Sequence, residues 1–364
     1  MVLVLSNKDV SRLLSMKRCV AALEEGFREL GRGRAVASNR RDSHSPSTRR
    51  GEIYYRFNTM EGIVYKLGVC AQRIDSERIM WKKIHGVVRQ VEVPSSHGGF
   101  VGLVYLYSTK DCRLLAVLND SEIQRMRVAG VCALAAKYLS RKDSKVLGLY
   151  GSGWQAETQV LAMSEVRKIE TVRVYSPSRA HREEFARKMS KRAGINMTAV
   201  DAPVEAARGA DIVSAATNAR QPVFDSSWLS PGLHLCGIGG GDYDEKTWEK
   251  SDLIYLCAKG LHEKYLMADP TMRPDLKYDH MTSAGGVDGS LYVKFSERTM
   301  YLPDLVVGNS PGRGSDEQIT LFQKVGTTQG VEFATTAKAV YDQAKKQGAG
   351  NEIPDEWFIQ RTPQ

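Results

Sequence analysis

The first 120 residues alternate between apolar and polar positions in ways that predict a helix followed by a sheet. Over residues 8–31 the apolar positions recur at helical spacing, which predicts one amphipathic helix that ends at Gly31 and Gly33. Residues 34–60 are polar and basic, and a loop with an edge strand is expected there. Residues 63–118 contain short apolar runs typical of strands, with a hairpin turn near residues 109–111.

The pattern then changes to short apolar strands that alternate with helices. This alternation predicts a doubly wound parallel sheet of the Rossmann type. The tail over residues 317–346 reads as one long helix, which is expected to return to the first domain. The predicted strands are 145–150, 171–175, 212–216, 233–238 and 253–257, and the predicted helices are 121–139, 151–163, 180–193 and 204–208.

Length, charge and cysteine usage narrow the class of protein. The 364 residues allow two domains, and no apolar run is long enough to span a membrane. The net charge of +9 accompanies no nucleic-acid motif, so carboxylates and cofactor phosphates explain it more simply than nucleic acid. The six cysteines form neither a C-x-x-C pair nor a zinc pattern, so no metal site is predicted. Reduced thiols and the absence of a signal peptide indicate a cytoplasmic protein.

The strongest motif follows the strand at 145–150 and opens a helix, as a dinucleotide-binding turn does. Gly151 permits a tight turn, Gly153 lets the backbone approach a pyrophosphate, and Ala156 allows the helix to pack on the strand. The helix N-terminus then offers N–H groups and a positive dipole to the phosphates. The whole motif reads Gly151-Ser152-Gly153-Trp154-Gln155-Ala156.

The end of the second strand decides between NAD and NADP. An acidic residue there would bind the ribose 2′-hydroxyl, but the segment 175–179 has none. It offers Ser176, Ser178 and Arg179, and an Arg suits a 2′-phosphate. NADP(H) is therefore favoured, with NAD(H) as the alternative. Thr217 and Asn218, after the next strand, are expected to line the ribose or nicotinamide, and Gly239 to let the backbone pass close to the ring.

Several segments resemble the ornithine cyclodeaminase/mu-crystallin family over about residues 30–346. They are VLGLYGSGWQA, VRVYSPSRAHREEFA, ADIVSAATNARQPVF, GLHLCGIGGGDYDE, LAVLNDSEIQRMRVAGVCALAAKYL and LPDLVVGNSPGR. The resemblance implies a homodimer in which residues 1–125 and 315–364 form an α+β substrate-binding and dimerisation domain. Residues 126–314 would form the Rossmann domain.

The resemblance also implies roles for individual side chains. The family's carboxylate-binding Arg matches Arg127, and an earlier one matches Arg40, with Arg41 as the neighbouring candidate. The family's acid after the fifth strand matches Asp244, near Asp242, and would handle charge at the substrate nitrogen. A helix N-cap is the alternative role for Asp244.

One departure concerns a Lys that the family carries in a motif similar to GVKWVS. In the matching stretch 68–76, Arg73 stands where that Lys would be, and Lys66 is the only Lys nearby. Arg binds carboxylates but does not act as a base, so ordinary ornithine cyclisation is in doubt. His97, in a segment expected to be a strand facing the cleft, is added as a substrate contact, although a structural role is more common for a lone His.

The sequence thus predicts an NAD(P)-dependent oxidoreductase. Hydride would pass to or from the α-carbon of a small amino acid or imino acid, as in an amino-acid dehydrogenase or an imine reductase. Asp244 and Arg73 are the expected catalytic residues. Two alternatives stay open: a cyclodeaminase that uses NAD in a closed redox cycle, and a non-catalytic NADP-binding protein similar to mu-crystallin.

Overall fold

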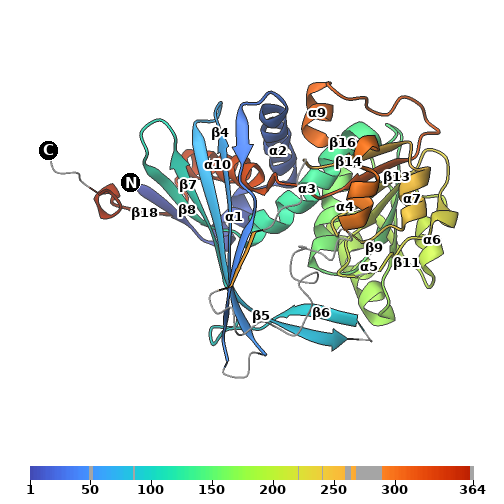
Figure 1. Cartoon of the computed structure of the whole chain (residues 1–364), viewed down its shortest axis with the longest axis horizontal. Helices are drawn as coiled ribbons and strands as arrows, with labels where there is room; N and C mark the ends of the chain where they lie inside the picture. Colours follow the sequence, from blue (N-terminus) through green and yellow to red (C-terminus); the bar gives the residue numbers. More distant parts are fainter. Residues whose placement is uncertain are drawn as a thin grey trace.

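The protein is built from two sheets that are joined by a long helix. The computed structural model describes residues 1–48, 52–84, 87–219, 221–239, 241–258, 264–267 and 289–360. Figure 1 shows one sheet standing beside a second domain in which helices flank the other sheet. No helix within the described ranges is both long and apolar enough to cross a bilayer.

The first sheet is mostly antiparallel and holds ten strands within the described residues, in the order β15-β3-β4-β5-β7-β8-β1-β18, with β2 beside β4 and β6 beside β5. One of its faces is covered by the C-terminal helix α10 (Gln329–Gln347), which packs on β4 and β5. Its strands are β1 Val2–Leu5, β2 Ala35–Ala37, β3 Arg41–Pro46, β4 Tyr54–Val64, β5 Val69–Ile84, β6 Val87–Glu92, β7 Val101–Ser108, β8 Leu114–Asn119, β15 Lys264–Met267 and β18 Asn351–Ile353. The predicted return of the C-terminal helix and the hairpin between β7 and β8 are confirmed.

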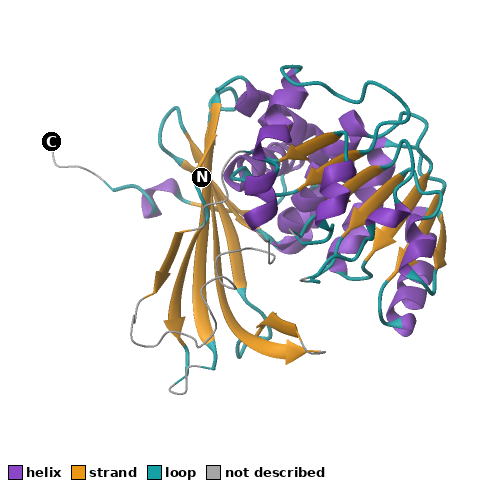
Figure 2. Cartoon of the chain, turned by 45° about the vertical axis from the view of Figure 1, so that its right-hand side comes forward, coloured by secondary structure: helices purple, strands orange, loops and turns teal. Residues whose placement is uncertain are grey.

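The second sheet is parallel at every pairing among the described strands, in the order β11-β10-β9-β12-β13-β17-β14-β16. Figure 2 shows helices on both of its faces, as expected for a doubly wound Rossmann-type fold. Its strands are β9 Val146–Tyr150, β10 Thr171–Tyr175, β11 Asn196–Ala199, β12 Ile212–Ala215, β13 His234–Gly237, β14 Leu253–Leu256, β16 Thr299–Tyr301 and β17 Thr320–Gln323. The predicted fold class is confirmed.

The helix α3 (Ser121–Leu139) links the two domains. It packs against α2, α4 and α10. Its apolar residues are buried nearly all the way around the helix, so it lacks the separate polar and apolar faces of a surface helix. The remaining helices are α1 Asn7–Leu13, α2 Met16–Gly31, α4 Trp154–Val166, α5 Arg179–Ala193, α6 Pro203–Ala207, α7 Glu245–Lys250, α8 Gly289–Lys294 and α9 Leu302–Val307, with short 3-10 turns η1 Ser226–Trp228, η3 Ser296–Arg298 and η4 Asp355–Trp357.

Two predicted helices are wrong in their extent. The single helix expected over 8–31 is two, because Leu14 is extended and the Ser15 hydroxyl caps a new helix by accepting from the Arg18 N–H. The helix expected over 317–346 contains a buried strand, β17, before α10 begins. Since β17 pairs with β13 and β14, residues 320–323 belong to the parallel sheet, whereas the expected boundary placed everything from 315 onward in the other domain.

Candidate active site

A tight glycine turn joins β9 to α4 at the carboxyl edge of the parallel sheet. Gly151 has a φ of +111°, in the region that only glycine adopts readily, and its N–H donates to the Tyr175 carbonyl over 2.8 Å. A Cβ at residue 151 would lie 2.3 Å from the Ala216 carbonyl oxygen. The turn therefore requires glycine here, and it lies against the neighbouring strand end.

The N-terminus of α4 is open to a ligand. Gly153 is the N-cap residue, no side chain of the described residues caps the helix, and a Cβ at 153 would have none of their heavy atoms within 4 Å. The uncapped N–H groups of the first turn and the helix dipole suit a pyrophosphate. Behind them Ala156 is fully buried, while Trp154 is 47% exposed and its ring lies 5.6 Å from the Arg125 guanidinium. Ser152 and Gln155 complete the motif.

We expect Gly153→Ala to weaken binding of a dinucleotide at least tenfold without lowering the melting temperature. The backbone at 153 has a φ of −96° and open space around it, so alanine is tolerated in the free protein. Its methyl group would occupy the place where the backbone approaches the phosphates. Calorimetric titration measures the affinity for the dinucleotide, and thermal denaturation measures the melting temperature. Unchanged affinity would show that the phosphates do not rest on this turn.

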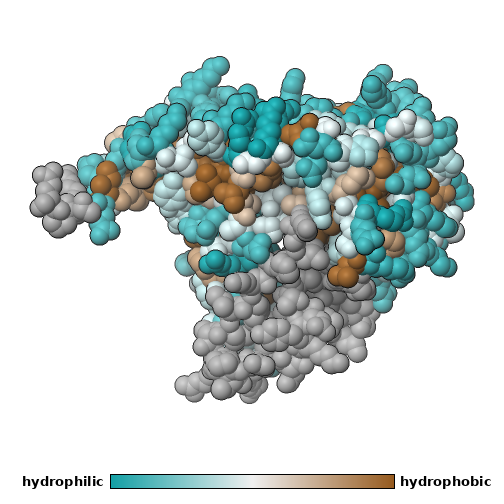
Figure 3. All heavy atoms as spheres, turned by 45° about the horizontal axis from the view of Figure 1, so that its top comes forward, coloured by the Kyte–Doolittle hydropathy of each residue, from teal (hydrophilic) through white to brown (hydrophobic). Residues whose placement is uncertain are grey.

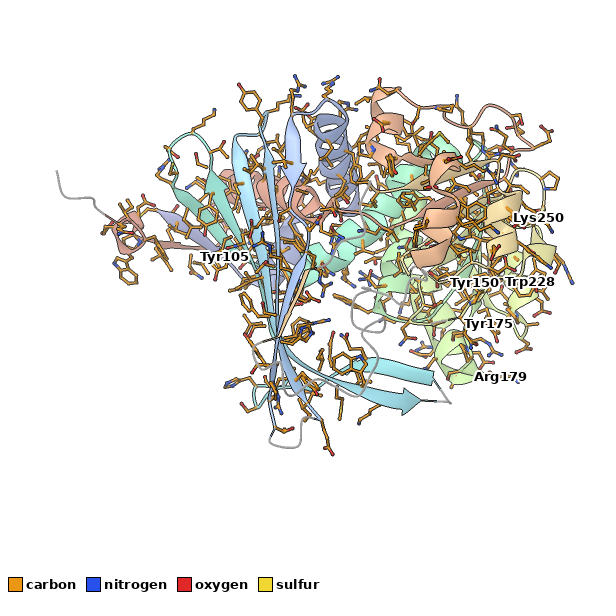
Figure 4. The ribbon with its side chains drawn as sticks, in the orientation of Figure 1. Tyr105, Tyr150, Tyr175, Arg179, Trp228 and Lys250 are labelled. Atoms are coloured by element: carbon orange, nitrogen blue, oxygen red, sulfur yellow. The ribbon has the colours of Figure 1, made fainter. Side chains whose placement is uncertain are left out.

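The end of β10 lies beside the glycine turn. The Ser176 and Ser152 hydroxyls hydrogen-bond over 2.9 Å, and Ser178 caps α5 by accepting from the His181 N–H. Arg179 begins α5, with its side chain 74% exposed and paired with Glu183 over 2.7 Å. Figure 4 shows Tyr150 and Tyr175 close together at this edge, with Arg179 on the neighbouring helix. Arg179 thus stands on the surface next to the turn, where it can reach a ligand by exchanging its partner.

A buried carboxyl group lies at the same edge of the sheet, beyond β12 and β13. Asp242 has no exposed surface, and it accepts hydrogen bonds from the Thr217 hydroxyl (2.9 Å) and the Gly239 N–H (3.1 Å). Burial raises its pKa to about 7, and these two hydrogen bonds offset only part of that effect. Asn218 follows Thr217 in an exposed loop position. A carboxyl group that titrates near neutral pH suits proton transfer.

Asp244 caps a helix, which is the alternative role that the sequence left open for it. It is the N-cap of α7 and accepts hydrogen bonds from the Thr247 N–H (2.8 Å) and hydroxyl (2.5 Å). Its carboxylate is thus used to begin a helix, whereas Asp242, two residues earlier, is buried against the strand ends. Of the two carboxyl groups, only that of Asp242 is both fully buried and free of a helix-capping role.

On the other domain, Arg73 lies on the inner face of β5 within a buried cluster. Its guanidinium donates to Asp120 (2.7 Å), Asn58 (2.6 Å) and Asp75 (2.8 Å). Burial raises the pKa of Asp120 above its usual range, although Arg73 opposes the shift. Three of the five N–H groups of Arg73 thus donate to described residues, and two of the three acceptors are carboxyl groups.

Arg127 of α3 lies near Arg73, because the guanidinium of each lies over the ring of Phe333, at 4.8 and 5.7 Å. Arg127 donates to Glu332 (2.7 Å) and to Gln124. Lys324, which directly follows β17, pairs with the same Glu332 over 3.2 Å. Burial by itself raises the pKa of Glu332, but the charges of Lys324 and Arg127 outweigh it and hold the pKa at about 2.

The remaining predicted substrate contacts are divided by the structure. Arg40 is mostly buried and paired with Asp42 over 2.7 Å, while its neighbour Arg41 is exposed, so Arg40 is the inward-facing one of the two. Lys66 is in the exposed turn after β4, where it pairs with Glu25 over 2.6 Å, and this turn lies before β5, the strand that carries Arg73. The strand expected at His97 is wrong: His97 lies exposed in a turn between β6 and β7.

Four residues near these groups were missed by sequence reasoning: Lys324, Glu332, Gln323 and Phe333. Each comes from the segment predicted as one long helix, so its place at a strand end or on the inner face of α10 could not be foreseen. For Asp75 a signal existed, because the alternation Arg73-Ile74-Asp75 places Arg73 and Asp75 on one face of a strand.

The fold and the site define a two-domain dinucleotide-binding protein whose mostly antiparallel sheet carries a buried cluster of charged side chains. The family model for the ornithine cyclodeaminase/mu-crystallin family matches residues 91–348. The chain belongs to this family.

Similar proteins cover between about two thirds and nearly all of the chain. Alanine dehydrogenase of Archaeoglobus fulgidus is 25% identical over 96% of this chain and 98% of its own. Δ1-pyrroline-2-carboxylate reductase of Bacillus cereus is 29% identical over 69% of this chain and 74% of its own. Among solved structures, the Thermococcus litoralis Δ1-pyrroline-2-carboxylate reductase in complex with NADH and L-proline superimposes with a TM-score of 0.76 and 27% identity, covering 97% of this chain and all of that one.

Proposed function

We propose that this chain is an NAD(P)(H)-dependent oxidoreductase that transfers hydride to or from the α-carbon of a small amino acid or its imine. The observation that carries the proposal is the open glycine turn with the buried carboxyl group of Asp242 at the same sheet edge. The relatives support it, since alanine dehydrogenase and pyrroline-2-carboxylate reductase are oxidoreductases of α-amino and α-imino acids.

The described residues fit a dinucleotide and a small carboxylate. Pyrophosphate would rest on the first turn of α4, and Thr217, Asn218 and Gly239 would line the nicotinamide end. When bound, the nicotinamide supplies or accepts the hydride. Arg127 and Arg40 would bind the substrate carboxylate, with Arg73 held beside them by its own carboxylate partners. Asp242 would give a proton to the imine nitrogen or take one from the amine.

We further propose that the cofactor is NADP(H), read by Arg179. Arg179→Ser is expected to weaken NADPH binding about 10- to 100-fold and to change NADH binding little, because a charge-assisted pair with the 2′-phosphate is lost. Arg187→Ser is the matched control, since its side chain lies on the same helix and is also 74% exposed. If both variants bind NADPH like the wild type, Arg179 does not read the phosphate.

A homodimer is proposed on the outer face of the first sheet. On β7, Leu103, Tyr105 and Tyr107 alternate with buried residues, and they remain only half-buried in the single chain. Figure 4 shows Tyr105 on this sheet, far from the Rossmann domain. Figure 3 shows further apolar residues on the C-terminal segment that follows β18. In that segment, Trp357 is 73% exposed. Exposed apolar surface of this kind marks an interface.

Tyr105→Glu is therefore expected to convert a dimer into a monomer in sedimentation analysis, because it places a charge in the middle of that face. Arg187→Glu, in the other domain, should leave the mass unchanged. A wild type that sediments as a monomer would contradict the dimer.

The substrate test is a panel of α-keto acids with ammonia or methylamine, together with cyclic imines, under NADPH and NADH. Consumption of the reduced cofactor by one member supports the proposal. Ammonia released from L-ornithine without net change in cofactor absorbance would favour the cyclodeaminase alternative. Cofactor binding without turnover of any compound would favour the binding protein.

A further inference from the structure

One buried amide at the carboxyl edge of the parallel sheet has no partner. Gln323 ends β17 and has no exposed surface, and neither its Oε1 nor its Nε2 is hydrogen-bonded to any described residue. Leaving a buried polar group unbonded costs about 1–3 kcal/mol, and such groups are nearly always bonded in folded proteins. The Gln323 amide therefore needs a partner from outside the described residues, which is an ordered water or a group of a bound ligand.

The amide shares its surroundings with Asp242. A Cβ built on Gly237 would lie 2.8 Å from Gln323 Oε1, 3.1 Å from Gln323 Nε2 and 3.0 Å from Asp242 Oδ2. Both side chains thus lie against the same face of Gly237, where even a methyl group would not fit unless one of them moved. The Asp242 carboxyl group and the Gln323 amide are therefore neighbours at the end of β13.

The strand register places this amide where the far end of a dinucleotide should lie. Tyr150, Ala215, Gly237 and Gln323 are aligned across β9, β12, β13 and β17. At about 4.8 Å for each strand spacing, Gln323 is about 14 Å across the sheet from the strand that opens the glycine turn. A dinucleotide with its pyrophosphate at that turn extends its nicotinamide along the same edge.

The chemistry of the amide selects among ligands. Gln323 offers one acceptor and one donor side by side, so its best partner offers a donor and an acceptor in return. A substrate carboxylate offers acceptors alone and would place an anion against Oε1 and the Asp242 carboxyl group. A primary carboxamide satisfies both atoms, whichever way the Gln323 amide is turned.

We propose that Gln323 binds the carboxamide of the nicotinamide through a reciprocal pair of hydrogen bonds, and so holds the ring beside Asp242. The inference rests on the proposed function, and it adds a residue from β17 to a site otherwise formed by the loops after β9, β12 and β13. Gly237 is part of the arrangement, because any side chain there would separate the two groups.

The test compares three ligands by calorimetric titration: NAD(P)H, its 3-acetylpyridine analogue, which keeps the carbonyl but lacks the NH2 group, and ADP-ribose with the matching 2′ group. The wild type is expected to prefer NAD(P)H over the analogue about tenfold, the worth of one buried hydrogen bond. Gln323→Met, of similar volume, should lose that preference and bind ADP-ribose as the wild type does. Gln159→Met is the matched control, since Gln159 is also fully buried and its Nε2 also has no partner among the described residues, but its Oε1 accepts a hydrogen bond from the Ser214 hydroxyl inside the domain.

Each outcome decides the matter. A Gln323→Met protein that keeps the preference, or that loses ADP-ribose binding as strongly as NAD(P)H binding, overturns the role of Gln323 and leaves the proposed function standing. A wild type that binds NAD(P)H and the analogue equally would also overturn the role of Gln323 and leave the proposed function standing. A wild type that binds none of the three ligands overturns both proposals together.

Discussion

Asp242→Asn is expected to lower the rate of imine reduction about 10²- to 10⁴-fold while dinucleotide binding persists, because the variant lacks the proton that the imine nitrogen requires. Burial raises the pKa of Asp242 from 3.8 to about 7. The protonated form is the donor, so wild-type reduction should fall as the pH rises through about 7. In Asp242→Asn the residual rate should lose that limb of the pH profile.

The same carboxyl group makes a separate prediction about stability. A pKa that is higher in the folded state stabilises the protein below the unfolded value, near 4, and that contribution is lost as the pH rises through about 7. Asp242→Asn should therefore unfold no more easily than the wild type at pH 8, which separates loss of chemistry from loss of structure. Asp244→Asn, which keeps a good helix N-cap, is the matched control and should retain most activity. If Asp244→Asn is the inactive variant instead, the roles assigned to the two residues are reversed.

Glu332→Gln is expected to destabilise the protein by about 3–5 kcal/mol, because it leaves the buried charges of Arg127 and Lys324 without their shared counterion. The pKa of Glu332 is about 2, so its contribution is present above the unfolded value of about 4.5 and is lost as the pH falls through about 2. Denaturant unfolding at neutral pH measures the difference. The loss should shrink in acid, where the wild-type carboxylate also gains its proton.

The control for Glu332 is a carboxylate in an exposed ion pair. Glu170, at the surface beside Lys145, contacts that Lys over 3.2 Å, and Glu170→Gln should change the stability little. A Glu332→Gln protein that unfolds like Glu170→Gln would show that the network around Arg127 is not a rigid part of the fold. In that case the ion pair with Glu332 would not be what holds Arg127 over Phe333.

The parallel sheet could be predicted closely because its signals are local. The glycine turn, its flanking strand and the helix that follows need only neighbouring residues, and predicted strands such as 171–175 match the structure. The strand at 320–323 was not predicted, because a buried strand and a buried helix have the same apolar pattern over four residues. The break at Ser15 was missed because the apolar spacing continues across it, although Ser is a strong N-cap.

The site was harder to predict than the fold because its groups come together from distant parts of the chain. Arg73 and Arg127 both lie over the ring of Phe333, and Glu332 pairs with Arg127, yet no spacing along the sequence predicts that these residues come together. The choice between Asp242 and Asp244 depended on burial and on a helix cap, which only the structure reveals. His97 was assigned to a strand from an apolar run that in fact begins at Val101, after a turn.

The most direct measurement follows one atom. A reduced nicotinamide dinucleotide that carries deuterium in place of both hydrogens at the ring carbon that donates hydride is incubated with the imine that the substrate panel selects, and the amino acid formed is analysed by mass spectrometry and NMR. We expect one deuterium at the α-carbon, with one cofactor oxidised for each product. Product without deuterium at that carbon would contradict hydride transfer from a nicotinamide held at the edge of this sheet.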